Sequence, residues 1–121
     1  MRKQLLALIG VLACAPCHAE PGDRSVPKTF NDAFFQTTLA AELIELAPER
    51  VIVAGWATDM CVDATIRSAA ALGFRGVAAR DATTVSDREH LPAEQIIEHC
   101  HWVWTHIISE HPVSILDEAA I

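Results

Sequence analysis

The 121-residue sequence is short of basic residues, with 9 lysines and arginines against 16 aspartates and glutamates and a formal net charge of −7. A nucleic-acid-binding surface needs a basic face, so the charge argues against a nucleic-acid partner. The chain also has no internal repeat and no low-complexity segment. Its length allows one domain at most. With 51% hydrophobic and 21% charged residues, it has the composition of an ordinary globular protein.

The chain also lacks an apolar run long enough to span a membrane, because the run near its N-terminus covers only residues 5–12. That run follows a basic start and precedes small residues ending at Ala19, which is the order of parts in a secretory signal peptide. We therefore predict a signal peptide over residues 1–19 and a periplasmic or secreted protein with no membrane contact after cleavage. Two alternatives remain: a lipoprotein cut before Cys14, or a buried first strand of a cytoplasmic domain.

Cysteine is scarce, and cleavage after Ala19 would leave only Cys61 and Cys100. In an oxidising compartment two thiols can form a disulfide. The sequence does not say whether these two come within reach of each other. A disulfide between them would block Cys61 as a nucleophile.

The pattern after the leader predicts an α/β domain over residues 28–121, joined by a polar, turn-rich linker at residues 20–27. Apolar runs predict strands at residues 51–54, 76–80 and 113–116. Helical periodicity predicts helices at residues 38–46, from Cys61 to the stop at Gly73, and from Pro92 to Ile108. Strands that alternate with helices indicate a parallel sheet with right-handed crossovers.

Cys61 stands at the most informative point of this pattern, in the first turn of the helix that follows the strand at residues 51–54. A free thiol has a pKa of roughly 8.5, and the N–H groups and partial positive charge of a helix N-terminus favour the thiolate. The carboxyl edge of a parallel sheet is also where open α/β folds bind ligands. The simpler alternative is a small buried side chain, which is what a free cysteine more often is.

Residues 55–74, GWATDMCVDATIRSAAALGF, together with the Asp81-Ala82-Thr83-Thr84 turn, resemble the nucleophile segment of the isochorismatase-like cysteine hydrolases. That family includes isochorismatases, nicotinamidases and related amidohydrolases. The resemblance runs from about residue 26 to the C-terminus and is most specific around Cys61. It implies a partial, doubly wound parallel sheet with flanking helices, a truncated version of the family's Rossmann-like three-layer fold.

The resemblance also implies site residues. In the family an Asp, a Lys and a Cys act together, and Cys61 and Lys28 match the last two, Lys28 through the segment KTFNDAF. The backbone N–H groups of Ala57 and Cys61 would form the oxyanion site, and a cis peptide would join Trp56 and Ala57. No cofactor is expected.

The family's Asp has no match before Lys28, since Asp23 lies in the linker and Asp32 follows the lysine. The first third to half of the usual domain, with the Asp/His metal cluster of nicotinamidases, is also missing.

A metal site built from His99, His101, His106 and His111 is not expected, because residues two apart on a helix point in different directions. An incomplete sheet leaves an open strand edge, so we expect a homo-oligomer, with Trp102 and Trp104 as packing anchors or interface residues.

Two functions follow. The first is a cysteine hydrolase that acts on a small amide or related small molecule through a thioester. The second is a catalytically incomplete half-domain with an assembly role or no activity, which the absent Asp favours.

Overall fold

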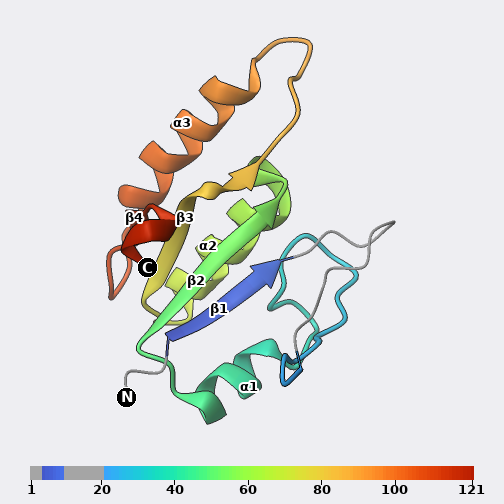
Figure 1. Cartoon of the computed structure of the whole chain (residues 1–121), viewed down its shortest axis with the longest axis vertical. Coiled ribbons are helices and arrows are strands. Elements are labelled where there is room, and N and C mark those ends of the chain that lie inside the picture. Colours follow the sequence, from blue (N-terminus) through green and yellow to red (C-terminus); the bar gives the residue numbers. More distant parts are fainter. Residues whose placement is uncertain (1–3, 10–20) are drawn as a thin grey trace.

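The computed structural model describes the backbone of residues 4–9 and 21–121 and the side chains of residues 21–121. Strands and helices alternate along the chain (Figure 1). Their bounds are β1 Gln4–Ile9, α1 Leu39–Leu46, β2 Arg50–Trp56, the π-helical turn η1 Thr58–Val62, α2 Asp63–Ala71, β3 Gly76–Thr84, α3 Ala93–Thr105, β4 Ser114–Leu116 and the 3₁₀ turn η2 Glu118–Ala120.

The strands form one sheet in the order β1-β2-β3-β4, and every neighbouring pair is parallel. The predicted α/β class with a parallel sheet is therefore confirmed. β3 is longer than the predicted strand at residues 76–80. After an irregularity beyond Val53, its last residues pair again with the end of β2, Gly55 with Thr83 and Trp56 with Thr84.

β1 lies in the segment that the sequence assigns to a signal peptide. It pairs with β2 from Gln4 opposite Arg50 to Ile9 opposite Gly55. This is the alternative arrangement, in which the segment is the first strand of the domain. The predicted cleavage site after Ala19 and the alternative site before Cys14 lie outside the described residues, so processing stays a prediction. Cleavage after Ala19 would remove β1.

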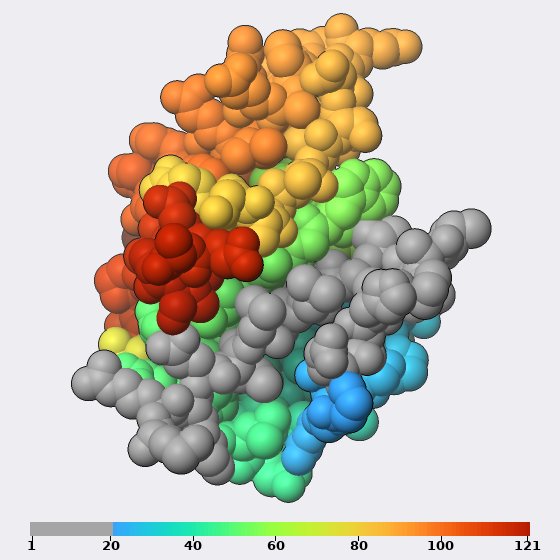
Figure 2. Space-filling view, viewed as in Figure 1, coloured from blue at the N-terminus to red at the C-terminus, as the bar shows by residue number. Residues whose placement is uncertain are grey.

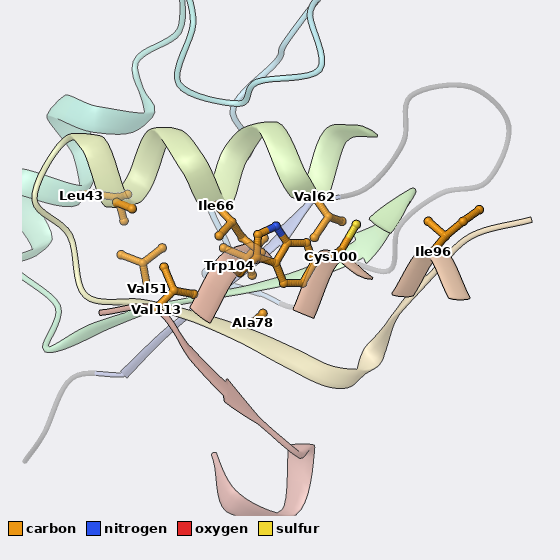
Figure 3. Packing of buried hydrophobic residues seen from close by; sticks show 11 residues of the cluster. Leu43, Val51, Val62, Ile66, Ala78, Ile96, Cys100, Trp104 and Val113 are labelled. Carbon is orange, nitrogen blue, oxygen red and sulfur yellow. The ribbon is translucent and has the colours of Figure 1, made fainter. Parts of the chain in front are cut away.

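Helices α1, α2 and α3 all pack on one face of the sheet, and Figure 3 shows the resulting core. Every second residue of β2, Val51 and Val53, points into it, as the two-residue period of a strand requires. The remaining buried members come from the helices and from β3 and its flanks: Leu43, Val62, Ile66, Ala70, Ala78, Ile96, Cys100, Trp104 and Val113. No helix in the described part of the chain is long and apolar enough to span a bilayer.

The two tryptophans of α3 have different surroundings. Trp104 is completely buried, which confirms it as a packing anchor, whereas 60% of Trp102 is exposed. The Trp104 indole Nε1–H donates to Asp63 Oδ1 at 2.7 Å, which joins α3 to the first residue of α2. The ring of Trp102 stacks instead on that of His106, with 4.0 Å between the centroids.

The opposite face of the sheet carries a smaller cluster formed by Ile52, Ala54, Val77 and Ala79, against which Ala82, Leu116 and Ile121 pack. The C-terminal turn η2, red in Figure 2, lies against β3, in yellow. Two polar contacts hold it there. Glu118 N–H donates to Asp81 Oδ1 at 2.8 Å, and Arg80 pairs with Asp117 at 3.0 Å. Asp81 therefore caps the C-terminal turn.

Two glycines occupy positions that need a positive φ. Gly73 has φ +82° just after α2, where Phe74 N–H bonds to the Ala69 carbonyl, as the sequence predicts for a helix C-terminus. Gly55, with φ +126°, lies near the end of β2. A side chain at either position would strain the backbone. The second glycine matters more for function, because the chain turns there toward Cys61.

Candidate active site

The turn that carries Cys61 is compact and internally hydrogen-bonded. The Trp56–Ala57 peptide is cis, at the bond that the family resemblance implies. The Ala57 carbonyl accepts hydrogen bonds from Met60 N–H at 3.0 Å and from Val62 N–H at 3.2 Å. Cys61 thus lies in η1, one π-helical turn before α2, rather than in the first turn of a regular α-helix. It is half-buried at the carboxyl end of β2.

Lys28 reaches this turn because its segment is fastened to α2. Ala33 N–H donates to the buried Thr65 Oγ1 at 3.0 Å, and the Ser68 hydroxyl donates to the Asp32 carboxylate. Thr65 and Ser68 follow Cys61 by four and seven residues, a spacing that places side chains along one helix face, so these bonds hold the segment close to Cys61. Asp32, which the sequence could not assign, is a tether for this segment.

Among the described residues, the Cys61 sulfur has two polar partners. Lys28 Nζ donates to Sγ at 3.5 Å and to the Phe30 carbonyl at 2.9 Å. The thiol donates to Asn31 Oδ1 at 3.5 Å. An ammonium group beside a sulfur stabilises the thiolate, since an opposite charge within about 4–6 Å favours the ionised form. The structure therefore brings together the two side chains that the sequence nominated as catalytic.

Asn31 is a site residue that the sequence reasoning did not single out. Its position three residues after Lys28, in the segment used to identify that lysine, was the available signal. A thiolate has no proton to donate and only accepts hydrogen bonds. The bond to the Asn31 oxygen therefore requires the proton of the thiol, whereas the contact with Lys28 does not.

The third group implied by the family resemblance is an acid, and no acid of residues 21–121 is a partner of the sulfur. Its partners in that range are the cationic Lys28 and the uncharged Asn31. Asp32 is engaged with Ser68 and with Phe34 N–H. Across residues 21–121 no group of three or more His, Cys, Asp or Glu side chains is arranged to hold a metal ion. The oxyanion role of the Ala57 and Cys61 N–H groups stays a prediction.

Cys100 provides an internal contrast to Cys61. Both thiols are free. Cys100 is buried in the core, and burial, followed by the negative charges of Asp63 and Asp59, raises the pKa of its thiol to about 11. Such a thiol carries almost no thiolate at neutral pH. Cys100 is thus a packing residue and serves as a matched control for Cys61.

The parallel α/β fold, with a cysteine at the carboxyl edge of the sheet, is also found in known proteins. The family model described as the isochorismatase domain matches residues 13–107. The chain belongs to the isochorismatase family. A solved structure described as an isochorismatase family protein is 35% identical, with a TM-score of 0.71, over 82% of this chain and 57% of that one. An isochorismatase from Pseudomonas putida KT2440 superposes over 98% of this chain and 69% of its own, with a TM-score of 0.79 and 20% identity, and so shows the fold.

Curated relatives match the chain over a shorter stretch. The ureidoacrylate amidohydrolase RutB of Variovorax paradoxus (strain S110) is 39% identical over 64 residues, which are 53% of this chain and 25% of that protein. RutB of Agrobacterium fabrum (strain C58 / ATCC 33970) is 38% identical over 64 residues, which are 53% of this chain and 28% of that protein. The match spans about a quarter of the length of these relatives.

Replacing Lys28 by Met is expected to slow the alkylation of Cys61 at pH 7 by about tenfold or more, because the cation next to the sulfur is lost. The measurement is the rate of iodoacetamide labelling of Cys61, followed by mass spectrometry. Arg24→Met is the matched control, since Arg24 is a cation four residues before Lys28 that pairs with Glu42 and Glu45. Equal rates for the Lys28 variant and the wild type would contradict an electrostatic role for this side chain.

Proposed function

We propose that the protein is a cysteine hydrolase that cleaves a small amide or a related small molecule through a thioester on Cys61. The observation that carries the proposal is the 3.5 Å contact between Lys28 Nζ and Cys61 Sγ at the carboxyl edge of the parallel sheet. Membership in the isochorismatase family supports it. So do its similarities to ureidoacrylate amidohydrolases and to a nicotinamidase.

The chemistry begins with attack of the thiolate on the substrate carbonyl carbon, which gives a tetrahedral oxyanion. Lys28 and the N–H groups of Ala57 and Cys61 are the candidates to stabilise this charge. Such donors lower the barrier of acyl transfer by a few kcal/mol in other hydrolases. The carbon–nitrogen bond then breaks as the nitrogen takes a proton from water, and the amine leaves. Water finally attacks the thioester, which releases the acid and the free thiol.

The proposal is tested by the selectivity of labelling together with turnover. At pH 7 iodoacetamide should modify Cys61 much faster than Cys100 and faster than a model thiol, because the Cys100 thiol, with a pKa of about 11, is almost fully protonated. A panel of small amides, including ureido and nicotinamide-like compounds, is then screened for ammonia or amine release. A Cys61 labelling rate no faster than that of the model thiol would overturn the proposal.

The alternative, a catalytically incomplete half-domain, is favoured by one observation. Within residues 21–121, neither polar partner of the sulfur is a carboxylate, although the family uses an Asp. This alternative predicts fast labelling of Cys61 with no turnover of any amide in the panel. We further propose that the protein is exported as a form that begins at Glu20. We also propose that this form assembles into a homo-oligomer.

A further inference from the structure

A second ion pair lies on the same turn as the nucleophile. Arg88 Nη2 contacts the two carboxylate oxygens of Asp59 at 2.9 Å and 3.1 Å, and Asp59 precedes Cys61 by two residues. The two side chains are only 27% and 30% exposed, Asp59 and Arg88 respectively. They come from different parts of the chain, 29 residues apart, so no local sequence pattern reveals the pair.

Arg88 lies in the loop between β3 and α3, which has several internal hydrogen bonds. Arg88 N–H donates to the Leu91 carbonyl at 2.8 Å, and Leu91 N–H returns a bond to the Arg88 carbonyl at 3.3 Å. Asp87 Oδ1 accepts from Ala93 N–H, the first residue of α3, at 2.8 Å. The loop between β3 and α3 therefore holds the guanidinium against the turn, whereas a free surface arginine would lose more side-chain entropy on pairing.

Asp59 would act against the nucleophile if it stood alone. A carboxylate near a thiol disfavours the thiolate. The negative charge of Asp59 reaches even Cys100 in the core, where it is one of the causes that raise the pKa of that thiol. Arg88 places a positive charge 2.9 Å from the Asp59 carboxylate and so offsets the field of that carboxylate at the turn.

The other charged groups on the elements around the turn are either paired or exposed. Asp63, at the start of α2, binds Arg67 and the Trp104 indole, and Asp32 binds Ser68. α3 faces the turn with the neutral Cys100, and its Glu94, Glu98 and His99 are exposed. Lys28 is the cation in contact with the sulfur itself.

We propose that Arg88 is a positioning residue for the hydrolase site: it neutralises Asp59, so that the Lys28 ammonium acts on the Cys61 sulfur without opposition from a carboxylate on the same turn. The inference rests on the proposed function, because it concerns the reactivity of that thiol. It adds a specific role for the loop between β3 and α3, which holds no residue of the Lys28–Cys61 pair.

The test is the pH dependence of iodoacetamide labelling of Cys61 in the full chain, for the wild type, Arg88→Gln, Asp59→Asn and the double variant. Arg88→Gln exposes the carboxylate and is expected to move the midpoint of the labelling curve up by about half a pH unit to one unit. Asp59→Asn leaves the Arg88 guanidinium without an opposite charge and is expected to lower the midpoint of the labelling curve by a similar amount. The double variant should return close to the wild-type midpoint, and Arg88→Lys should largely preserve it.

If the ion pair of Arg88 with Asp59 only holds the turn in shape, the labelling midpoints change in a different way. Both single variants would then loosen the turn, and their midpoints would stay fixed or move in the same direction. That outcome overturns the proposal. If Arg88→Gln does not fold, as judged by circular dichroism, Asp59→Asn still decides, since an unchanged or raised midpoint in that variant is also incompatible with the charge role.

The labelling test does not need turnover, so its failure is distinguishable from that of the proposed function. A wild-type thiol that labels no faster than a model thiol overturns the hydrolase proposal, while the midpoints of the variants still report on the ion pair. Opposite shifts with no amide turnover would retain Arg88 as a neutralising residue in a protein that is catalytically incomplete.

Discussion

The Cys61→Ala protein is expected to lose amide hydrolysis by a factor of about 10⁴ or more, because removal of a nucleophile leaves only binding and oxyanion stabilisation. The thioester cannot form without the sulfur that Lys28 contacts. The measurement is the initial rate of amine release with the best substrate of the amide panel. Mass spectrometry of a quenched reaction should also show an acyl adduct in the wild type and none in the variant.

Cys100→Ala is the matched control, because it makes the same substitution at the other free thiol in the described part of the chain. Cys100 lies in the core, and Lys28 donates to Cys61 instead. The Cys100→Ala variant should therefore keep most of the turnover, although it loses some stability. Turnover that survives Cys61→Ala, or that disappears equally in both variants, would contradict nucleophilic catalysis by Cys61.

Trp104→Ala is expected to lower the free energy of unfolding by about 3–5 kcal/mol, which is the usual cost of emptying a buried tryptophan site. Trp104 is 0% exposed and joins α3 to α2 through its bond to Asp63. Domains are stable by only about 5–15 kcal/mol in total, so this variant should be largely unfolded at modest denaturant. Urea titration followed by circular dichroism measures the change.

Two further variants separate the contributions at this position. Trp104→Phe keeps much of the apolar contact and loses the hydrogen bond to a carboxylate, which should cost roughly 1–3 kcal/mol. Trp102→Ala removes the same type of residue two positions earlier, where 60% of the side chain is exposed, and should cost less than about 1 kcal/mol. Equal losses for the alanine variants at Trp104 and Trp102 would show that α3 is not anchored as the structure indicates.

Elements with strong local patterns could be predicted from the sequence. The run from Val51 to Ala54 is apolar throughout, and β2 forms there. Gly73 ends α2 with the left-handed conformation that its position predicts. β3 was harder to delimit, because Arg80 and Asp81 look like the end of a strand. The chain instead continues to Thr84, where pairing with the end of β2 resumes.

The candidate site was less accessible to sequence reasoning, because its parts meet over long separations. Lys28 and Cys61 are 33 residues apart, and only the family resemblance connects them. Their contact depends on tertiary bonds such as that between Ala33 N–H and Thr65, which no periodicity encodes. The ion pair of Asp59 with Arg88 has the same character. Residues that share a turn are visible in the sequence, whereas residues that meet across the fold are not.

The strand β1 lies within the predicted leader at residues 1–19, so the predicted cleavage would also bear on assembly. In the unprocessed chain β1 supplies hydrogen-bonding partners for β2 from Arg50 to Gly55. Cleavage after Ala19 would remove β1 and leave this edge of β2 unpaired, next to the turn that carries Cys61. The edge of β2 would then be open, and we expect it to pair with a strand of another molecule, so that processing would favour an oligomer.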